Sequence, residues 1–121
     1  KKIGFTFQEG ALFDSMNIYD NVAFPLREHT DLKEDEIKKR VFETLEMVGL
    51  DANRVAYLYP HELSGGMRKR AATARAIILK PKYVLYDEPT SGLDPVISDK
   101  ITRMIMDLNR NHNMTSVVIS H

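Results

Sequence analysis

The chain has 121 residues, with 17 basic and 17 acidic side chains and a formal net charge of zero. This length fits one domain or part of one, and the neutral balance indicates no nucleic-acid partner, because phosphate backbones select for basic faces. Cysteine is absent, which excludes a disulfide framework and a thiolate metal site. No apolar run approaches the roughly 20 residues that cross a bilayer, and no secretory signal opens the sequence.

A short strand and a helix are the first elements predicted along the chain. Residues 3–7 alternate apolar with small side chains, which is typical of a strand. Residues 17–27 carry apolar side chains four apart, which predicts a helix, and Pro25 near its end is expected to kink or end it.

A second helix is predicted from Thr30 or Asp31, both of which are good N-cap residues. Asp31 is followed three residues later by Glu34, which comes close to a capping box. The apolar stripe of this helix runs to Gly49, a natural C-terminal stop. A short helix is expected after it, from Asp51 onward.

A serine and two glycines precede the next predicted helix, which runs from about residue 67 to 79. Ser64, Gly65 and Gly66 would leave a cluster of backbone N–H groups free, and glycine lets a phosphate approach the backbone closely. An ordinary helix start is the alternative interpretation. The basic cluster of residues 68–70 that follows is interpreted as a solvated helix face.

Two carboxylates follow the next predicted strand. Residues 83–86 form an uninterrupted apolar run, typical of a strand buried on both faces, and Asp87 and Glu88 come directly after it. They would lie at the carboxyl edge of the sheet, where α/β proteins bind ligands. In P-loop ATPases a carboxylate at this position helps to hold Mg²⁺, and a neighbouring glutamate can polarise the attacking water. The alternative is a solvated turn after a core strand.

The last elements predicted are a helix and a strand. Asp94 would be the N-cap of the helix and Pro95 its first residue, and residues 116–120 form a second buried strand. A strand-helix-strand unit is nearly always right-handed and parallel. His121 would therefore lie at the same sheet edge as the two carboxylates.

These elements predict an α/β fold with parallel strands. The helical stretch between the first two strands is too long for a simple crossover, so we interpret residues from about 10 to 79 as an inserted helical subdomain. Residues 1–9 and about 80–121 would form the core.

Five short motifs follow one another along the chain: Gln8, Leu63-Ser64-Gly65-Gly66-Met67, Asp87-Glu88, Ser91-Gly92-Leu93-Asp94 and His121. Their order resembles the motif set of ABC-type ATPases, at the Q-loop, signature, Walker B, D-loop and switch-histidine positions, and the resemblance covers the whole chain. Residues 7–16 and 21–29 look like the ATPase subunit of Mla-type, MCE-associated phospholipid transporters of diderm bacteria. Met67 departs from the glutamine of many members; little loss is expected, because the backbone amides make the contact.

The resemblance implies a partial P-loop NTPase core, RecA-like, that pairs head to tail with a second nucleotide-binding subunit around two ATP molecules. Ser64, Gly65 and Gly66 would contact the partner's ATP, and Asp94 would brace the dimer. An integral membrane permease subunit is the other implied partner. The protein would then be cytoplasmic, peripheral on the inner face of the bacterial inner membrane.

The resemblance also implies the catalytic groups. Glu88 would be the general base, and His121 would hold the γ-phosphate and the attacking water. Asp87 would support Mg²⁺, while Gln8 would sense the metal and relay closure of the site to the membrane subunits. The complete protein would thus be an ATPase that powers transport, with phospholipid as the expected cargo.

One motif of the family is missing from these residues, the Gly-x-x-x-x-Gly-Lys-Ser/Thr loop of Walker A. Two explanations remain open: a piece of a longer ATPase, which we favour, or a degenerate subunit that completes a partner's site. On either one, these 121 residues alone are expected neither to bind ATP tightly nor to hydrolyse it.

Two other classes of protein are alternatives to a transport ATPase. A non-transport ABC ATPase shares every motif above but has no membrane partner. A non-catalytic module would need a broken Walker B or switch position, whereas Asp87, Glu88 and His121 are present. An apolar set after Gln8 would dock the membrane subunit, or pack in the core instead; its members are Phe13, Met16, Ile18 and Tyr19.

Overall fold

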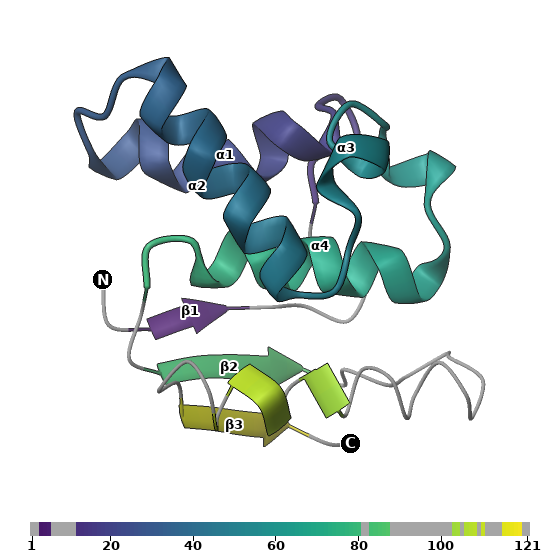
Figure 1. The fold of residues 1–121 in the computed structure, drawn as a ribbon. Coiled ribbons are helices and arrows are strands. Elements are labelled where there is room, and N and C mark those ends of the chain that lie inside the picture. The colour runs from purple at the N-terminus through teal and green to yellow at the C-terminus, as the bar shows by residue number, and fades with distance from the viewer. Residues whose placement is uncertain are drawn as a thin grey trace.

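The computed structural model describes residues 3–5, 12–80, 83–87, 103–104, 106–108, 110 and 115–119. The strands β1 (Ile3–Phe5), β2 (Tyr83–Asp87) and β3 (Thr115–Ile119) form a parallel sheet in the order β1-β2-β3. Asp87, the last residue of β2, pairs with Ile119, the last residue of β3. The three strands run side by side toward the same edge of the sheet (Figure 1).

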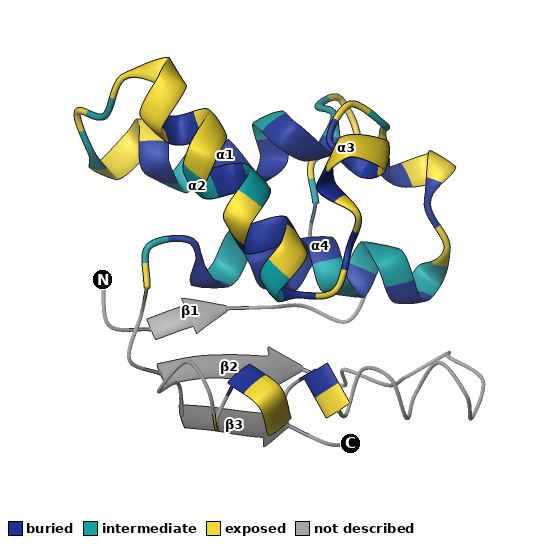
Figure 2. Ribbon diagram, in the orientation of Figure 1, coloured by how far each residue is buried: buried dark blue, intermediate teal, exposed yellow. Residues whose placement is uncertain are grey.

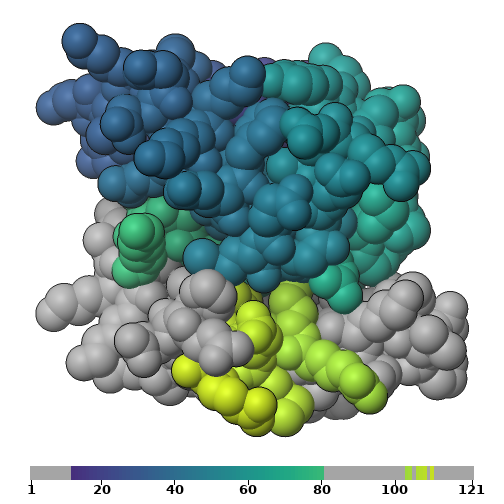
Figure 3. Space-filling model, in the orientation of Figure 1, coloured from purple at the N-terminus to yellow at the C-terminus, as the bar shows by residue number. Residues whose placement is uncertain are grey.

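Helices occupy the chain between β1 and β2. They are α1 (Ile18–His29), α2 (Glu34–Met47), α3 (Ala52–Val55), the 3₁₀ helix η1 (Pro60–Glu62) and α4 (Gly65–Ile77). Helix α4 lies between the other helices and the sheet (Figure 1), where it contacts α1, α2 and β1. Residues 12–80 form one continuous mass on the face shown in Figure 3. Within the described part of the chain, no helix combines the length and apolar character needed to span a membrane.

Helix α1 begins at a side-chain cap and continues past a proline. The Asn17 side-chain oxygen accepts a hydrogen bond from the Asp20 N–H at 2.8 Å, which satisfies one of the free donors of the first turn. Pro25, expected to kink or end this helix, does not end it, since α1 runs to His29. Pro25 lacks the N–H that would bond to the preceding turn. Packing compensates, because the next residue, Leu26, is fully buried.

Helix α2 begins later than predicted, so the assignment of Thr30 or Asp31 as its N-cap is wrong. The cap residue is Lys33, whose side chain makes no capping hydrogen bond. Thr30 instead ends α1: its hydroxyl donates to the Leu26 carbonyl at 2.6 Å, and its N–H donates to the same carbonyl at 3.0 Å.

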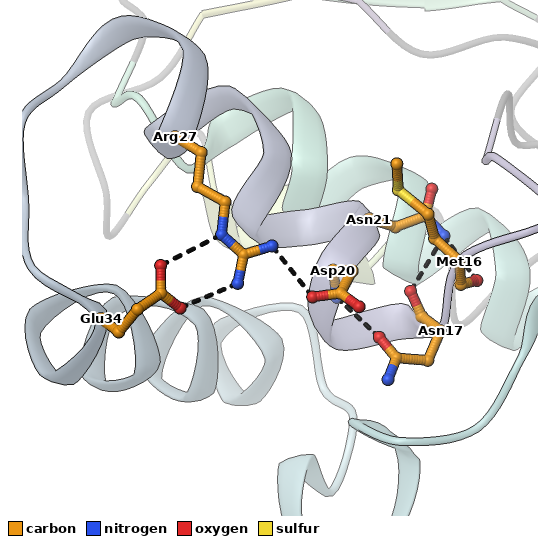
Figure 4. Close-up of polar contacts among 6 residues, drawn as sticks. All are labelled: Met16, Asn17, Asp20, Asn21, Arg27 and Glu34. Atoms are coloured by element: carbon orange, nitrogen blue, oxygen red, sulfur yellow. Dashed lines mark hydrogen bonds and ion pairs between the residues drawn. The ribbon is translucent and has the colours of Figure 1, made fainter.

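Glu34 is held by an arginine of α1 instead of closing a capping box (Figure 4). Arg27 donates Nη2 to Glu34 Oε1 at 2.8 Å and Nε to Glu34 Oε2 at 3.2 Å, and its Nη1 donates to Asp20 at 2.9 Å. The hydrogen bonds with Glu34, and then with Asp20, raise the pKa of Arg27, and the hydrogen bond with Arg27 lowers the pKa of Glu34. This bidentate contact uses both oxygens of the carboxylate, so α1 and α2 are tied together at their ends.

Gly49 follows the end of α2, as predicted, and adopts a left-handed conformation with φ of 83°, which favours glycine. A Cβ at this position would collide with the guanidinium of Arg70. Arg70 donates Nη1 to the Val48 carbonyl at 2.7 Å, and burial lowers its pKa. The end of α2 is therefore fastened to α4 by a side chain that the sequence pattern assigned to a solvated face.

The hydrophobic core lies among the helices (Figure 2). Met104 and Leu108 join side chains of α1, α2 and α4 in one cluster, so the helical stretch and the described residues near 103–110 share a core. The largest fully buried side chains are Ile18, Leu26, Ile37, Leu45, Ile77, Ile78, Leu108, Val22, Val41 and Val48.

A buried amide in α1 fastens the segment that precedes this helix. The Asn21 side-chain oxygen accepts from the Phe13 N–H at 2.7 Å, and its nitrogen donates to the carbonyls of Phe13 at 3.0 Å, Met16 at 3.1 Å and Asn17 at 3.0 Å. Asn21 is fully buried, and Figure 4 shows its amide turned toward Met16. Residues 13–17 are thus held in place by one side chain.

We expect Asn21→Ala to lower the free energy of unfolding by about 3 kcal/mol, because it leaves several buried backbone groups without partners. Urea denaturation of the full-length protein that contains these residues measures this loss. Asn53→Ala, on the exposed surface of α3, is the matched control and should change stability by less than about 0.5 kcal/mol. Equal effects of the two substitutions would contradict the role given to Asn21.

Candidate nucleotide-contact site at the start of helix α4

The site residues predicted from sequence divide into two groups. Ser64, Gly65 and Gly66 lie together at the start of α4, and Asp87 ends β2. The other four lie outside the described residues: Gln8, Glu88, Asp94 and His121.

Ser64 is the N-cap of α4, in agreement with its predicted place before a helix. Its backbone is extended, with ψ of 167°, and its hydroxyl oxygen accepts from the Met67 N–H at 3.2 Å. The Ser64 side chain is exposed, Gly65 is half-buried and Gly66 is buried. The helix starts two residues earlier than predicted and ends at Ile77, because the capped turn includes both glycines.

A tight turn leads into this cap. The Tyr59 N–H donates to Glu62 Oε1 at 2.9 Å, and the Leu63 N–H donates to the Pro60 carbonyl at 3.1 Å. Pro60 was expected to close the preceding segment, and it does so by beginning η1. Leu63 is 4% exposed and packs into the core, so the residue ahead of Ser64 is anchored.

The first turn of α4 is electrostatically suited to an anion. Helix N-termini carry partial positive charge and unpaired N–H groups, and the first turn of α4 contains no acidic residue. Arg68 adds a positive charge one turn into the helix. Phosphate groups are among the anions that such a helix start binds.

The basic cluster at residues 68–70 is not a solvated face, which corrects the sequence interpretation. Arg68 donates Nη1 to the Leu63 carbonyl at 2.7 Å, and Arg70 bonds to the end of α2. Lys69 is only 9% exposed. The sequence of a helix does not show which carbonyls from other segments its charged side chains reach. The hydrogen bonds of Arg68 and Arg70 were therefore missed.

The apolar set after Gln8 is divided between core and surface. Ile18 is fully buried and Tyr19 is 9% exposed, so these two pack in the core, whereas Phe13 is 40% exposed. The guanidinium carbon of Arg75, on α4, lies 4.4 Å from the centre of the Phe13 ring and 5.8 Å from that of Phe24, a cation–π arrangement. Burial lowers the pKa of Arg75. This stack joins α4 to the segment between β1 and α1.

Comparison with known proteins gives the same result as the motifs. A model of the ABC transporter family matches residues 1–91. The probable ribonucleotide transport ATP-binding protein Mkl of Mycobacterium leprae is 52% identical over 118 residues, covering 98% of this chain and 33% of that protein. The intermembrane phospholipid transport system ATP-binding protein MlaF of Haemophilus influenzae is 50% identical over 121 residues, covering 100% of this chain and 45% of that protein. The chain thus spans less than half of the length of these relatives.

Solved structures resemble the whole chain. A dimeric ATP-binding cassette in a post-hydrolysis state with ADP and Pi matches with a TM-score of 0.85 and 36% identity, covering 100% of this chain and 53% of that one. The cassette cbiO1 of Clostridium perfringens, part of an ABC transporter complex, matches with a TM-score of 0.88 and 33% identity, covering 99% of this chain and 47% of that one. The chain therefore belongs to the ABC transporter family and resembles its ATP-binding subunits.

Proposed function

We propose that this chain is part of an ATP-hydrolysing subunit that pairs head to tail with a second copy and sandwiches ATP between the two. The start of α4 carries the proposal, because Ser64 caps a helix whose first turn is free of acidic residues. Such a turn can receive the terminal phosphate of an ATP that a partner subunit holds. The dimeric cassette with ADP and Pi, which resembles the full length of this chain, supports the same arrangement.

In this proposal, Ser64, Gly65 and Gly66 complete the partner's site. The hydroxyl of Ser64 and the N–H groups of the two glycines would meet the γ-phosphate when the subunits close. Only the closed dimer would make these contacts. ATP would therefore bind the closed dimer more tightly than the open subunits, and this difference in affinity is enough to favour closure. Asp94 would brace the dimer near the partner's site. The phosphate-gripping loop would come from residues outside these 121.

Catalysis is assigned to the sheet edge. Carboxylate and amide oxygens are the ligands that Mg²⁺ prefers, so Asp87 and Gln8 fit this ion, which neutralises charge on the phosphates when bound. Glu88 directly follows the end of β2, which pairs with the end of β3. As general base, it would take a proton from the attacking water, while His121 would hold the γ-phosphate and the same water.

Transport is the process that hydrolysis would power. Relatives are named for intermembrane phospholipid transport and for ribonucleotide transport, and residues 7–16 and 21–29 favour the phospholipid assignment. A permease subunit in the bacterial inner membrane would carry the cargo, with this protein on its cytoplasmic face. The helical segment of about residues 10–79 would be the subdomain inserted into the nucleotide-binding core, whose parts would be residues 1–9 and about 80–121.

Sedimentation of the full-length protein tests the sandwich directly. With the metal chelated so that ATP is not consumed, ATP is expected to convert monomers into dimers, and ADP is not. The same sedimentation pattern with both nucleotides would contradict the proposal. Dimers that release no phosphate once Mg²⁺ is restored would indicate a non-catalytic subunit, and purification from membranes without a permease would indicate a non-transport ATPase.

A further inference from the structure

Arg68 reaches backward from the first turn of α4 to the residue ahead of the cap. Its Nη1 donates to the Leu63 carbonyl at 2.7 Å, and its backbone N–H donates to the Ser64 carbonyl at 2.9 Å. On the other side, the Leu63 N–H donates to the Pro60 carbonyl at 3.1 Å. The backbone of Leu63 is therefore held from both directions.

This clamp acts directly on the residue that would meet ATP. The Leu63 carbonyl belongs to the peptide group that leads into Ser64, so fixing it fixes the rotation of that peptide. The Leu63 side chain cannot follow a shift of the backbone freely, because it is buried in the core. Ser64 in turn bonds to the Met67 N–H. The guanidinium thus holds the backbone that leads into the cap and the two glycines.

The helix dipole opposes a guanidinium at this position, so the hydrogen bond to Leu63 is made at a cost. A positive charge near a helix N-terminus is repelled by the helix dipole, and no acidic residue in the first turn offsets it. An arriving polyphosphate would offset it. If α4 only supported the fold, an uncharged side chain at this position would be better, because it would avoid the repulsion by the helix dipole.

We propose that Arg68 is a positioning residue for the partner's ATP, one that holds the Leu63 carbonyl so that Ser64, Gly65 and Gly66 keep the orientation that receives the γ-phosphate. This inference rests on the proposed function, and it assigns a task to a residue outside the serine and glycines themselves. Arg68 would act on the nucleotide only indirectly, through the position of Ser64 and the two glycines, and would have no part in the chemical step.

The test compares Arg68→Met with the wild type in the full-length protein. We expect kcat for ATP hydrolysis to fall by about tenfold, because Ser64 and the glycines would lose the orientation that the closed state needs, and small misplacements of contact groups cost rate. The KM for ATP should change by less than about twofold, because the other subunit's loop makes most of the ground-state contacts. The fraction of Arg68→Met that forms dimers with ATP should fall in proportion to kcat. Arg54→Ala, an exposed arginine of α3, is the matched control and should behave as the wild type.

Arg68→Lys separates positioning from support of the fold. An ammonium can donate to the same carbonyl, so we expect this variant to recover most of kcat. The inference is overturned if Arg68→Met keeps full kcat, or if kcat falls only together with the unfolding midpoint and lysine rescues neither. A wild type that neither dimerises with ATP nor hydrolyses it removes the proposed function. A wild type that does both, beside an unimpaired Arg68→Met, removes this inference alone.

Discussion

Glu88→Gln is expected to lower ATP hydrolysis by the full-length protein by roughly 10²–10⁴-fold, the usual contribution of a general base. Glutamine keeps the size of the side chain and its ability to bond to water, but it does not take up the proton that the attacking water must lose. The position directly after β2 supports this choice, since Asp87 ends the central strand of the sheet. A change of one atom at Glu88 would therefore stop the chemistry without altering the fold.

Phosphate release at saturating ATP measures this effect, and ATP-driven dimerisation provides the internal check. Dimers of Glu88→Gln should form as readily as those of the wild type and should last longer, because the nucleotide that holds them is not consumed. Glu43→Gln, on the exposed face of α2, is the matched control and should leave turnover unchanged. Turnover of Glu88→Gln within a few-fold of the wild type would exclude Glu88 as the base.

Local signals in the sequence predicted the parts of the fold that depend on neighbouring residues. Ser64 caps α4 because its hydroxyl meets an N–H three residues later, and Gly49 follows α2 because its φ is positive. Both effects are contained within one turn of the chain. The short helix expected after Asp51 is also present, as α3, although the Asp51 side chain makes no capping hydrogen bond.

Contacts between distant segments were beyond the reach of a sequence pattern. Glu34 was expected to close a capping box, but Arg27 of the preceding helix binds its carboxylate. Arg70 was expected in solvent, but it bonds to the Val48 carbonyl, 22 residues away at the C-cap of α2. Asn21 gave no signal at all, although its amide makes four hydrogen bonds. In each case the deciding partner is supplied by tertiary packing, which periodicity does not encode.

The candidate site was predicted by the order of its motifs rather than by geometry. Ser64 lies at the start of a helix and Asp87 at the end of a strand, and nothing in the spacing between them indicates that they would serve two different nucleotides. That idea came from the resemblance to the family. What the structure adds is the physical character of one half of the site: a capped and acid-free helix start with an exposed serine, whose preceding carbonyl bonds to Arg68.

Gly65→Asp separates the role of this helix start in ATP binding from its role in folding. A carboxylate at the first position of a helix complements the dipole by about 0.3–1 kcal/mol, and glycine is itself a poor helix residue. The unfolding midpoint should therefore stay the same or rise. The new carboxylate would also repel the phosphate of ATP. Two negative unit charges 4 Å apart near a protein surface repel each other by about 4 kcal/mol. ATP-driven dimerisation and kcat should consequently fall on the order of 10²-fold or more.

Gly65→Asn is the control that isolates charge, because it has nearly the same shape as the aspartate without its negative charge. It should retain far more turnover than Gly65→Asp, while both unfold at similar temperatures. Equal losses in the two variants would mean that the space at Gly65 matters rather than the charge, and a parallel loss of stability would mean that the helix start had simply been damaged. Activity that falls in Gly65→Asp and much less in Gly65→Asn, while both variants keep their stability, is the result expected of an anion-binding helix start, because folding and phosphate binding then place opposite demands on the same side chain.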